Sequence, residues 1–282
     1  LDVSCLELSA DHLRIQFGSE SYGGVVQLHD GTGRRLRRFR VPDEEHGEPV
    51  AVRLSPSGRR VLGVVGEVAY LWDAEGPLLA TLRHERHEVT GARFSPDERH
   101  VVTESFGEIT LWTIEGEPLR TVRVVHDDRG EDGCIQMTAW APQGDRIATT
   151  DGDRIRVWSL DGELLTEMLA GSEVGDAYVT EIEFITEIEF LPTGDRVVGT
   201  TSADVRIWGC DGHLHAILPA SVNDQMGYAL SHTGRYVAVA SSDNSVQLWT
   251  ADGELVLALP RSDDEFLGAR FLRGDETLVV IR

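Results

Sequence analysis

The chain contains no lysine: all 26 of its basic residues are arginine, set against 48 acidic residues. A chain without lysine cannot supply the phosphate-binding lysine of a P-loop or a Schiff-base lysine. The formal net charge of −22 argues against nucleic acid or an anionic membrane surface as the main partner, because both require a basic footprint. The exclusive use of arginine is associated with a high-GC genome.

Cysteine and long apolar runs are scarce as well. The three cysteines, Cys5, Cys134 and Cys210, lie far apart and show neither a disulfide framework nor metal-ligand spacing. This pattern predicts a reducing, cytoplasmic compartment. No apolar run reaches the roughly 18 residues of a membrane-spanning helix. The chain begins Leu1-Asp2-Val3-Ser4, so we expect no signal peptide and a piece of a longer or processed chain.

The sequence does contain a repeated strand–turn–strand pattern. Its clearest copy spans residues 246–255, with an apolar strand ending in Trp249, a turn at Asp252-Gly253 and a second strand from Leu255. Asp-Gly between apolar runs predicts a tight hairpin, because glycine tolerates the positive φ of the turn. The aromatic position recurs at intervals of 43, 40, 46, 50 and 41 residues: His29, Trp72, Trp112, Trp158, Trp208 and Trp249.

Each repeat carries four strand signals. The first strand ends before a polar turn such as Ser95-Pro96-Asp97, where proline and glycine set the turn dihedrals. Repeats of this length with four strands each indicate the blades of a β-propeller. We predict one domain over residues 1–282, because no linker interrupts the repeats. The expected repeats are 1–41, 42–84, 85–124, 125–170, 171–219, 220–260 and a partial 261–282.

The motif Phe94-Ser95-Pro96-Asp97, followed by the strand ending Leu111-Trp112 and the hairpin at Gly116, resembles the WD40 repeat. The resemblance covers the whole chain. It implies an all-β, WD40-like β-propeller of four-stranded antiparallel blades, seven-bladed, with the last blade incomplete in this chain. The Asp-Gly-x-Leu hairpins are similar to those of the C-terminal WD-repeat domains of large bacterial signalling and defence proteins.

The sequence also departs from that family. The Trp-Asp dipeptide occurs once, at Trp72-Asp73. Members of the family often hold each blade with a His, Asp, Ser or Thr, and Trp hydrogen-bond tetrad. Asp243, Ser245 and Trp249 match three of its places without the histidine, and the other repeats lack most of it. The resemblance therefore implies that apolar packing between blades supplies most of the stability.

A duplicated segment lengthens one repeat. Thr-Glu-Ile-Glu-Phe occurs at 180–184 and again at 186–190. The second copy leads directly into the turn at 191–194, so we predict that it forms the inner strand. We expect the first copy to extend that strand or to bulge above it.

The sequence shows no recognisable catalytic or metal-binding pattern. The segment His84-Glu85-Arg86-His87 lacks helical zinc-protease spacing and is expected in a solvated loop. His213 and His215 share a strand face without a third ligand. The acidic segments 127–133 and 151–153 lack calcium-loop spacing and are expected to be turns, and no Gly-x-Ser-x-Gly elbow occurs. We therefore expect no catalytic residue, metal site or cofactor.

The loops between repeats carry the one patterned surface signal. In a propeller these loops emerge on one face, opposite the turns that carry Arg59, Arg60, Arg99, Arg146, Arg196 and Arg235. Three aromatic residues could anchor a partner there: Tyr22, Phe106 and Tyr178. The turns between second and third strands would add Glu67, Asp151, Asp153, Asp204 and Asp243. The acidic loop residues are Asp43, Glu44, Glu45, Glu48, Glu85, Glu88, Asp127, Asp128, Glu131, Asp132, Glu173, Asp176, Asp224, Asp263, Asp264 and Glu265.

These features favour a non-catalytic binding or sensing module. We expect it to be the recognition domain of a larger bacterial signalling or defence protein, and to bind a basic protein segment on the acidic face. That segment would come from a partner or from elsewhere in the parent chain. Two alternatives stay open: a hydrolytic enzyme that uses the propeller channel, and a structural assembly disc with an apolar edge.

Overall fold

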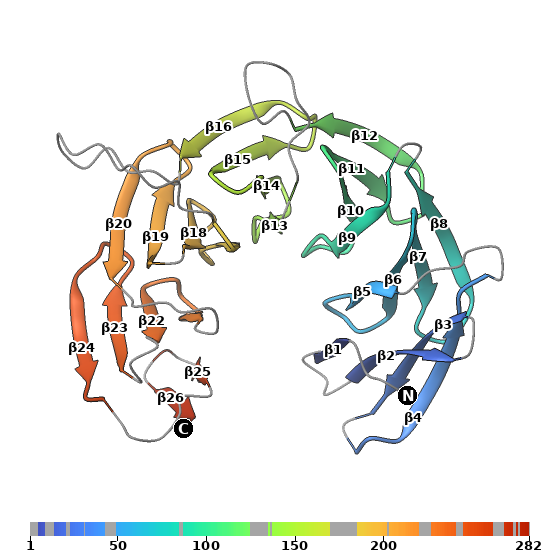
Figure 1. Ribbon diagram of the computed structural model, residues 1–282, viewed down its shortest axis with the longest axis horizontal. Helices are drawn as coiled ribbons and strands as arrows, with labels where there is room; N and C mark the ends of the chain where they lie inside the picture. The colour runs from blue at the N-terminus through green and yellow to red at the C-terminus, as the bar shows by residue number, and fades with distance from the viewer. Residues whose placement is uncertain are drawn as a thin grey trace. The chain divides into compact units, whose positions relative to one another are not determined.

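The fold was analysed in a computed structural model, which describes residues 5–8, 14–20, 23–30, 32–42, 49–84, 87–124, 135, 137–169, 185–201, 203–219, 227–240, 245–261, 268–272, 275 and 277–281. All 26 elements in these ranges are β-strands (Figure 1). Because the described residues form strands and turns, they include no apolar helix of membrane-spanning length.

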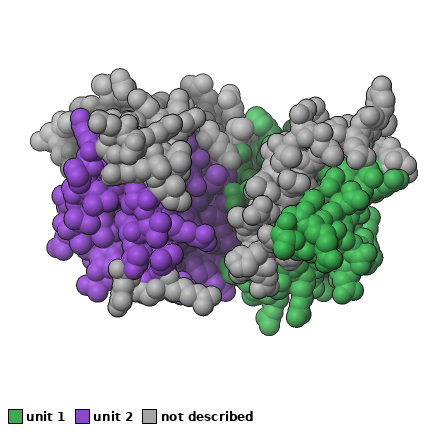
Figure 2. All heavy atoms as spheres, turned by 90° about the horizontal axis from the view of Figure 1, so that it is seen from below, with its two compact units in different colours: residues 1–135 green, residues 136–282 purple. Residues whose placement is uncertain are grey.

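The strands fall into two compact units, residues 1–135 and 136–282 (Figure 2). Each of the first six repeats forms an antiparallel sheet of four strands in sequence order, as predicted. Unit 1 holds β1 (Cys5–Leu8), β2 (Arg14–Glu20), β3 (Gly23–His29), β4 (Arg35–Arg40), β5 (Pro49–Leu54), β6 (Arg60–Val65), β7 (Val68–Asp73), β8 (Leu78–Arg83), β9 (Val89–Phe94), β10 (His100–Ser105), β11 (Glu108–Thr113) and β12 (Pro118–Arg123).

Unit 2 contains three more sheets of four strands and one of two. The two-stranded sheet corresponds to the predicted partial repeat. The strands are β13 (Met137–Trp140), β14 (Arg146–Thr150), β15 (Arg154–Ser159), β16 (Leu164–Leu169), β17 (Glu187–Phe190), β18 (Arg196–Thr200), β19 (Asp204–Gly209), β20 (Leu214–Pro219), β21 (Tyr228–Leu230), β22 (Tyr236–Ala240), β23 (Val246–Thr250), β24 (Leu255–Leu259), β25 (Gly268–Phe271) and β26 (Leu278–Ile281).

The hairpin between the third and fourth strands is the same in every four-stranded sheet. The pairing register shifts at the aromatic position in all six, for example between Leu71 and Trp72. The turn closes with a glycine of positive φ, such as Gly253 at 88°, as the Asp-Gly signal predicts. The bulge and the glycine explain why this short motif could be recognised in the sequence.

Within each unit, consecutive sheets pack face to face through apolar side chains. Trp72 of β7 is 2% exposed and its ring centroid lies 5.6 Å from that of Phe39 on β4. A second cluster in unit 2 joins Trp208 to Ile155 and Met168 of the preceding sheet. Gly63 stands beside Trp72: a Cβ there would lie 2.9 Å from the indole. Apolar side chains therefore fill these interfaces, and their share of the stability stays a prediction.

The duplicated segment is placed as predicted where the structure describes it. Residues 187–190 of the second copy form β17, which pairs with β18. Ile188 and Phe190 are buried in the core between sheets. The first copy, residues 180–184, lies outside the described residues.

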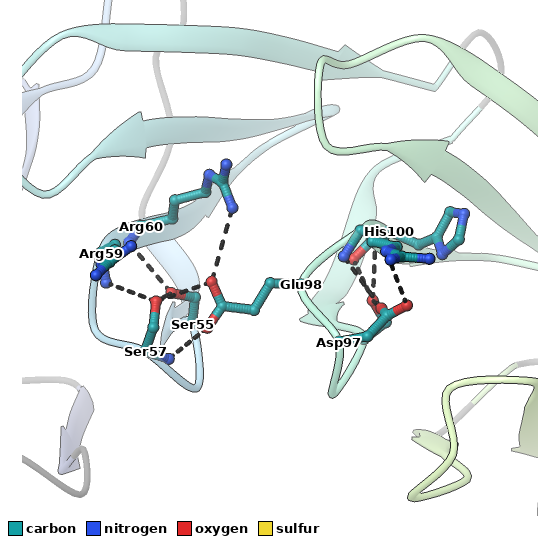
Figure 3. Close-up of polar contacts among 9 residues, drawn as sticks. Ser55, Ser57, Arg59, Arg60, Asp97, Glu98 and His100 are labelled. Atoms are coloured by element: carbon teal, nitrogen blue, oxygen red, sulfur yellow. Dashed lines mark hydrogen bonds and ion pairs between the residues drawn. The ribbon is translucent and has the colours of Figure 1, made fainter.

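Charged side chains connect the turns of neighbouring sheets. Glu98 and Asp275, each with φ of 58°, are the non-glycine residues of positive φ in the described part of the chain. The corresponding turn residue elsewhere is glycine, as at Gly58. Glu98 accepts hydrogen bonds from the amide and the hydroxyl of Ser57, with Arg60 Nη1 3.6 Å away (Figure 3).

Asp275 makes the same contact in unit 2. It accepts hydrogen bonds from the amides of His232 (2.6 Å) and Thr233 (2.9 Å) and from the Thr233 hydroxyl. A left-handed conformation costs a non-glycine residue about 1–2 kcal/mol. Hydrogen bonds to a charged group are stronger than those between neutral groups, and these contacts favour the left-handed conformation of Asp275. We call these two contacts the carboxylate clasps.

Two of the arginines expected on the turn side donate hydrogen bonds to the next sheet. Arg146 Nη2 donates to the Gly194 carbonyl at 2.8 Å. Arg196 Nη1 donates to the Ala251 carbonyl at 2.8 Å and to Asp252 at 2.7 Å. These guanidinium groups therefore serve the architecture at this end of the sheets.

Replacing Glu98 with glycine tests the first clasp. Glu98→Gly relieves the backbone strain but removes the hydrogen-bond acceptor. We therefore expect the free energy of unfolding to fall by about 1–3 kcal/mol. Urea denaturation would measure the change, with the exposed Glu115→Gln of the neighbouring hairpin as a charge-matched control expected to match wild type. A glycine variant more stable than wild type would show that the strain exceeds the value of the clasp.

Candidate binding surface

The described part of the predicted binding face contains Glu88 and Phe106. Glu88 is exposed, and Phe106 is 47% exposed. The Phe106 ring meets His87 edge-on, with ring centroids 5.8 Å apart. His87 precedes Glu88 in the chain, so the structure brings the two predicted residues to the same end of the β9–β12 sheet.

The other predicted binding residues lie outside the described residues. They are Tyr22, Asp43, Glu44, Glu45, Glu48, Glu85, Asp127, Asp128, Glu131, Asp132, Glu173, Asp176, Tyr178, Asp224, Asp243, Asp263, Asp264 and Glu265. Their place on one face stays a prediction.

Two carboxylates expected on that face are buried instead. Asp151 is 6% exposed and accepts a hydrogen bond from Arg156 Nη1 at 2.7 Å. Asp204, 8% exposed, receives Arg206 in a bidentate pair, with Nε at 2.8 Å and Nη2 at 3.0 Å. A buried charge requires a partner, and each aspartate neutralises an arginine inside its own sheet. The expectation that they add to the face was wrong.

Glu67 and Asp153, the other two turn carboxylates, stand beside arginines. Glu67 lies 3.8 Å from Arg83, and both side chains are about half exposed. Asp153 lies 3.8 Å from Arg154 Nε. Exposed pairs of this kind contribute little to stability, so Glu67 remains available to a ligand.

A hydrogen-bonded relay lies beside the third sheet. Trp112 Nε1 donates to Thr103 Oγ1 at 2.8 Å, Thr103 Oγ1 contacts His84 Nε2 at 2.6 Å, and His84 Nδ1 contacts Glu108 Oε1 at 3.2 Å. A neutral imidazole that donates from Nδ1 and accepts at Nε2 satisfies the whole relay. Burial lowers the pKa of His84, and the nearby Glu108 carboxylate only partly opposes this.

This relay corrects two expectations. His84 is 3% exposed rather than part of a solvated loop. Thr103 and Trp112 of the third repeat also share one network with His84, although the sequence indicated that this repeat lacks most of the tetrad. The available signal was the nine-residue spacing of Thr103 and Trp112, which recurs at Thr149 and Trp158, where Trp158 Nε1 donates to Thr149 Oγ1 at 3.0 Å.

The sixth repeat, where the tetrad resemblance was strongest, lacks the hydroxyl on its second strand. Cross-strand register places Val239 opposite Gln247, as Thr103 is placed opposite Thr110. Valine cannot accept the indole hydrogen, and Trp249 Nε1 has no hydrogen-bond partner among the described residues. Ser245 precedes the third strand, so it does not take the place of that hydroxyl.

A groove of about 770 Å³ lies next to the relay in unit 1. It runs between β8 of one sheet and β11–β12 of the next. Its lining is polar and carries both signs of charge: Thr81, Arg83, His84, Glu108, Thr110, Trp112, Pro118, Thr121 and Arg123. The Oγ1 atoms of Thr110 and Thr121 are 3.0 Å apart. The arrangement can bind a polar side chain.

The described residues contain no group of three or more metal-ligating side chains. His215 of the predicted histidine pair lies 3.9 Å from Asp211. Burial raises the pKa of the Cys210 thiol, so this cysteine stays protonated near neutrality.

The comparisons with known proteins address the fold. Residues 211–250 match the family described as WD domain, G-beta repeat. The β-propeller domain of Myceliophteria thermophila Cps50 (Swd1) superposes with a TM-score of 0.64 over 99% of this chain and 93% of that one, at 18% identity. The chain folds as a WD40-like β-propeller. No curated protein sequence matches it.

The sheets are therefore blades. We number them along the chain, so that blade 2 is β5–β8, blade 3 is β9–β12, blade 4 is β13–β16 and blade 5 is β17–β20. The six four-stranded blades and the two-stranded β25–β26 sheet agree with the predicted seven-bladed propeller with an incomplete last blade. At this level of identity the structural likeness describes the fold and leaves the ligand open.

Removing the imidazole of His84 tests the relay. Because the folded-state pKa lies below the ordinary value near 6.5, the unfolded chain binds the proton more readily. The free energy of unfolding of the wild type should then fall as the pH is lowered from 7.5 to 5.5. His84→Gln should lose about 1–3 kcal/mol at pH 7.5 through unpaired buried groups, and should show a weaker pH dependence.

The exposed His213→Gln serves as the control for this measurement. It should keep both the stability and the pH dependence of the wild type in urea denaturation series. An unchanged pH slope in His84→Gln would mean that the relay does not hold a neutral imidazole.

Proposed function

We propose that this propeller is a non-catalytic recognition module that binds a basic protein segment on the face formed by the loops between blades. The observation that carries the proposal is that a carboxylate is exposed at one end of blade 3 and hydrogen-bonded to the neighbouring blade at the other. At the loop end Glu88 and Phe106 are exposed. At the turn end Glu98 is engaged in a clasp. An exposed aromatic beside a carboxylate suits a cationic partner.

The overall charge supports the same direction. With a net charge of −22, the propeller attracts cations at long range and repels nucleic acid and anionic surfaces. On the turn side, Arg146 and Arg196 are bonded to neighbouring blades, which leaves them less able to recognise an anion. We expect no cofactor.

The parent protein is part of the proposal. The Asp-Gly hairpins resemble those of bacterial signalling and defence proteins, so we propose that this propeller is the recognition domain of such a protein in the cytoplasm. An effector domain would then be attached to it. The basic segment could belong to a partner or to the parent chain itself.

One observation favours the alternative of an assembly disc. The outer strands carry half-exposed aliphatic side chains, which is the edge that this alternative requires. They are Leu78, Leu79, Leu119, Leu164, Leu165, Leu169, Leu255, Val256 and Leu257. If assembly is the function, size-exclusion chromatography with light scattering should show oligomers that Leu255→Glu with Leu257→Glu disperses.

Neutralising one loop tests the main proposal. Replacing Asp127, Asp128, Glu131 and Asp132 with Asn or Gln should slow association with a basic peptide and flatten its salt dependence, because steering is electrostatic. Stopped-flow association rates between about 0.05 and 0.3 M salt, within the range where screening changes strongly, would measure the effect.

The control has the same change in net charge on the hairpins at the opposite end of the blades. Glu75, Glu115, Glu117 and Glu163 are all exposed there, and their replacement with Gln should leave the association rate much closer to wild type. Equal rates in the two quadruple variants would contradict a loop-face site, as would a partner seated on the turn side.

A further inference from the structure

The residue two positions before the blade tryptophan differs in size among the blades. It is Tyr70, Arg156, Arg206 and Gln247 in blades 2, 4, 5 and 6, but Thr110 in blade 3. Tyr70, Arg156 and Arg206 are buried, so in those blades a long side chain fills this position. In blade 3 the short threonine lines the 770 Å³ groove instead. Thr110 is also buried, at 5% exposed, but its side chain is short, and the groove lies where other blades hold a long side chain.

Blades 4 and 5 show what this position can hold. Arg156 Nε donates to Glu167 at 2.6 Å and its Nη1 donates to Asp151 at 2.7 Å. Arg206 forms the bidentate pair with Asp204 described above. In both blades a buried guanidinium group is neutralised by carboxylates of the same blade.

Blade 3 has a carboxylate, Glu108, but carries Thr110 where blades 4 and 5 carry an arginine. Glu108 is the first residue of β11, four positions before Trp112, and Asp204 stands in the same register four positions before Trp208. Its side chain is 18% exposed and one oxygen is held by His84. The hydroxyls of Thr110 and Thr121 lie alongside, and both can accept hydrogen bonds.

We propose that the groove between blades 2 and 3 receives an arginine side chain of the bound basic segment, with Glu108 as its carboxylate partner. This inference rests on the proposed function and names its specificity pocket. A guanidinium group has five donors in a planar fork, so it can pair with Glu108 and donate to the threonine hydroxyls at the same time. A lysine ammonium group cannot match that bidentate geometry.

Arg83 and Arg123 also line the groove, and their positive charges would repel an incoming guanidinium group. Arg83 lies 3.8 Å from Glu67, and Arg123 faces Glu108 across the β11–β12 pair. Glu67 reduces the repulsion between Arg83 and the incoming guanidinium group, whereas Arg123 would share Glu108 with that group. An acidic ligand held by Arg83 and Arg123 is the competing outcome that the experiment must separate.

The experiment uses the capped peptides Gly-Arg-Gly, Gly-Lys-Gly, Gly-citrulline-Gly and Gly-Glu-Gly. Binding to the whole chain would be followed by NMR through the indole resonance of Trp112, which lines the groove. We expect the arginine peptide to bind at least about tenfold more tightly than the lysine and citrulline peptides, a difference equivalent to one lost charged contact.

Variants then locate the site. Thr110→Arg places a guanidinium group where Arg206 stands in blade 5, so it should fill the groove, keep the melting temperature and abolish binding of the arginine peptide. Thr110→Ser is the matched control and should bind as the wild type does. Glu108→Gln should weaken binding about tenfold, with circular dichroism confirming that it is folded.

The outcomes separate this inference from the proposed function. Wild-type affinity in Thr110→Arg would overturn the groove site, while a salt-dependent association that the loop variant slows would still support the face. If Thr110→Arg loses binding of the arginine peptide while the loop variant associates with the basic peptide as the wild type does, the groove site is supported and the loop-face site is contradicted. Tighter binding of the glutamate peptide, or no selectivity for arginine over lysine, would overturn the arginine assignment.

Discussion

Packing of the tryptophan side of one blade against the outer strands of the preceding blade is the contact on which the rest of the structure depends. Trp72 against Phe39 in unit 1 and Trp208 against Met168 in unit 2 show the same arrangement. The indole fills the space between sheets, and its neighbour on the second strand adapts to it, being glycine at 63 and threonine at 103. Within each unit, blades bury apolar side chains against their neighbours. The polar contacts of a blade depend on which residues stand at this interface.

The polar contacts differ from blade to blade with the residues on the second and third strands. Where the second strand offers a threonine, the indole gains a hydrogen bond, and in blade 3 His84 and Glu108 extend it into a relay. Where the third strand carries arginine, an aspartate is buried with it. In blade 3 the short Thr110 fills the interface incompletely, and a groove lies beside it.

The fold could be predicted from the sequence because its determinants are local. The Asp-Gly hairpins, the tryptophan spacing and the Pro-Gly turns all act within a few residues, and β17 followed from the position of the turn after it. Residues whose role depends on a distant partner could not be predicted. His84 could not be placed because its partner Thr103 lies 19 residues away in the sequence. Asp204 has a near partner in Arg206, but the burial of that pair depends on tertiary packing, which the sequence does not show. Glu98 is separated by 41 residues from Ser57, the group that makes its backbone conformation favourable.

The carboxylate clasps have a consequence for cooperativity. A chain of repeats in which each one contacts its neighbours behaves as a row of units joined by nearest-neighbour coupling terms. The junctions here are chemically unequal: Glu98 and Asp275 accept hydrogen bonds from the preceding turn, while Arg146 and Arg196 donate to the following one. The coupling between adjacent blades therefore differs from one junction to the next. Within each unit, the residues in the turns therefore determine which blade junction we expect to open first during unfolding.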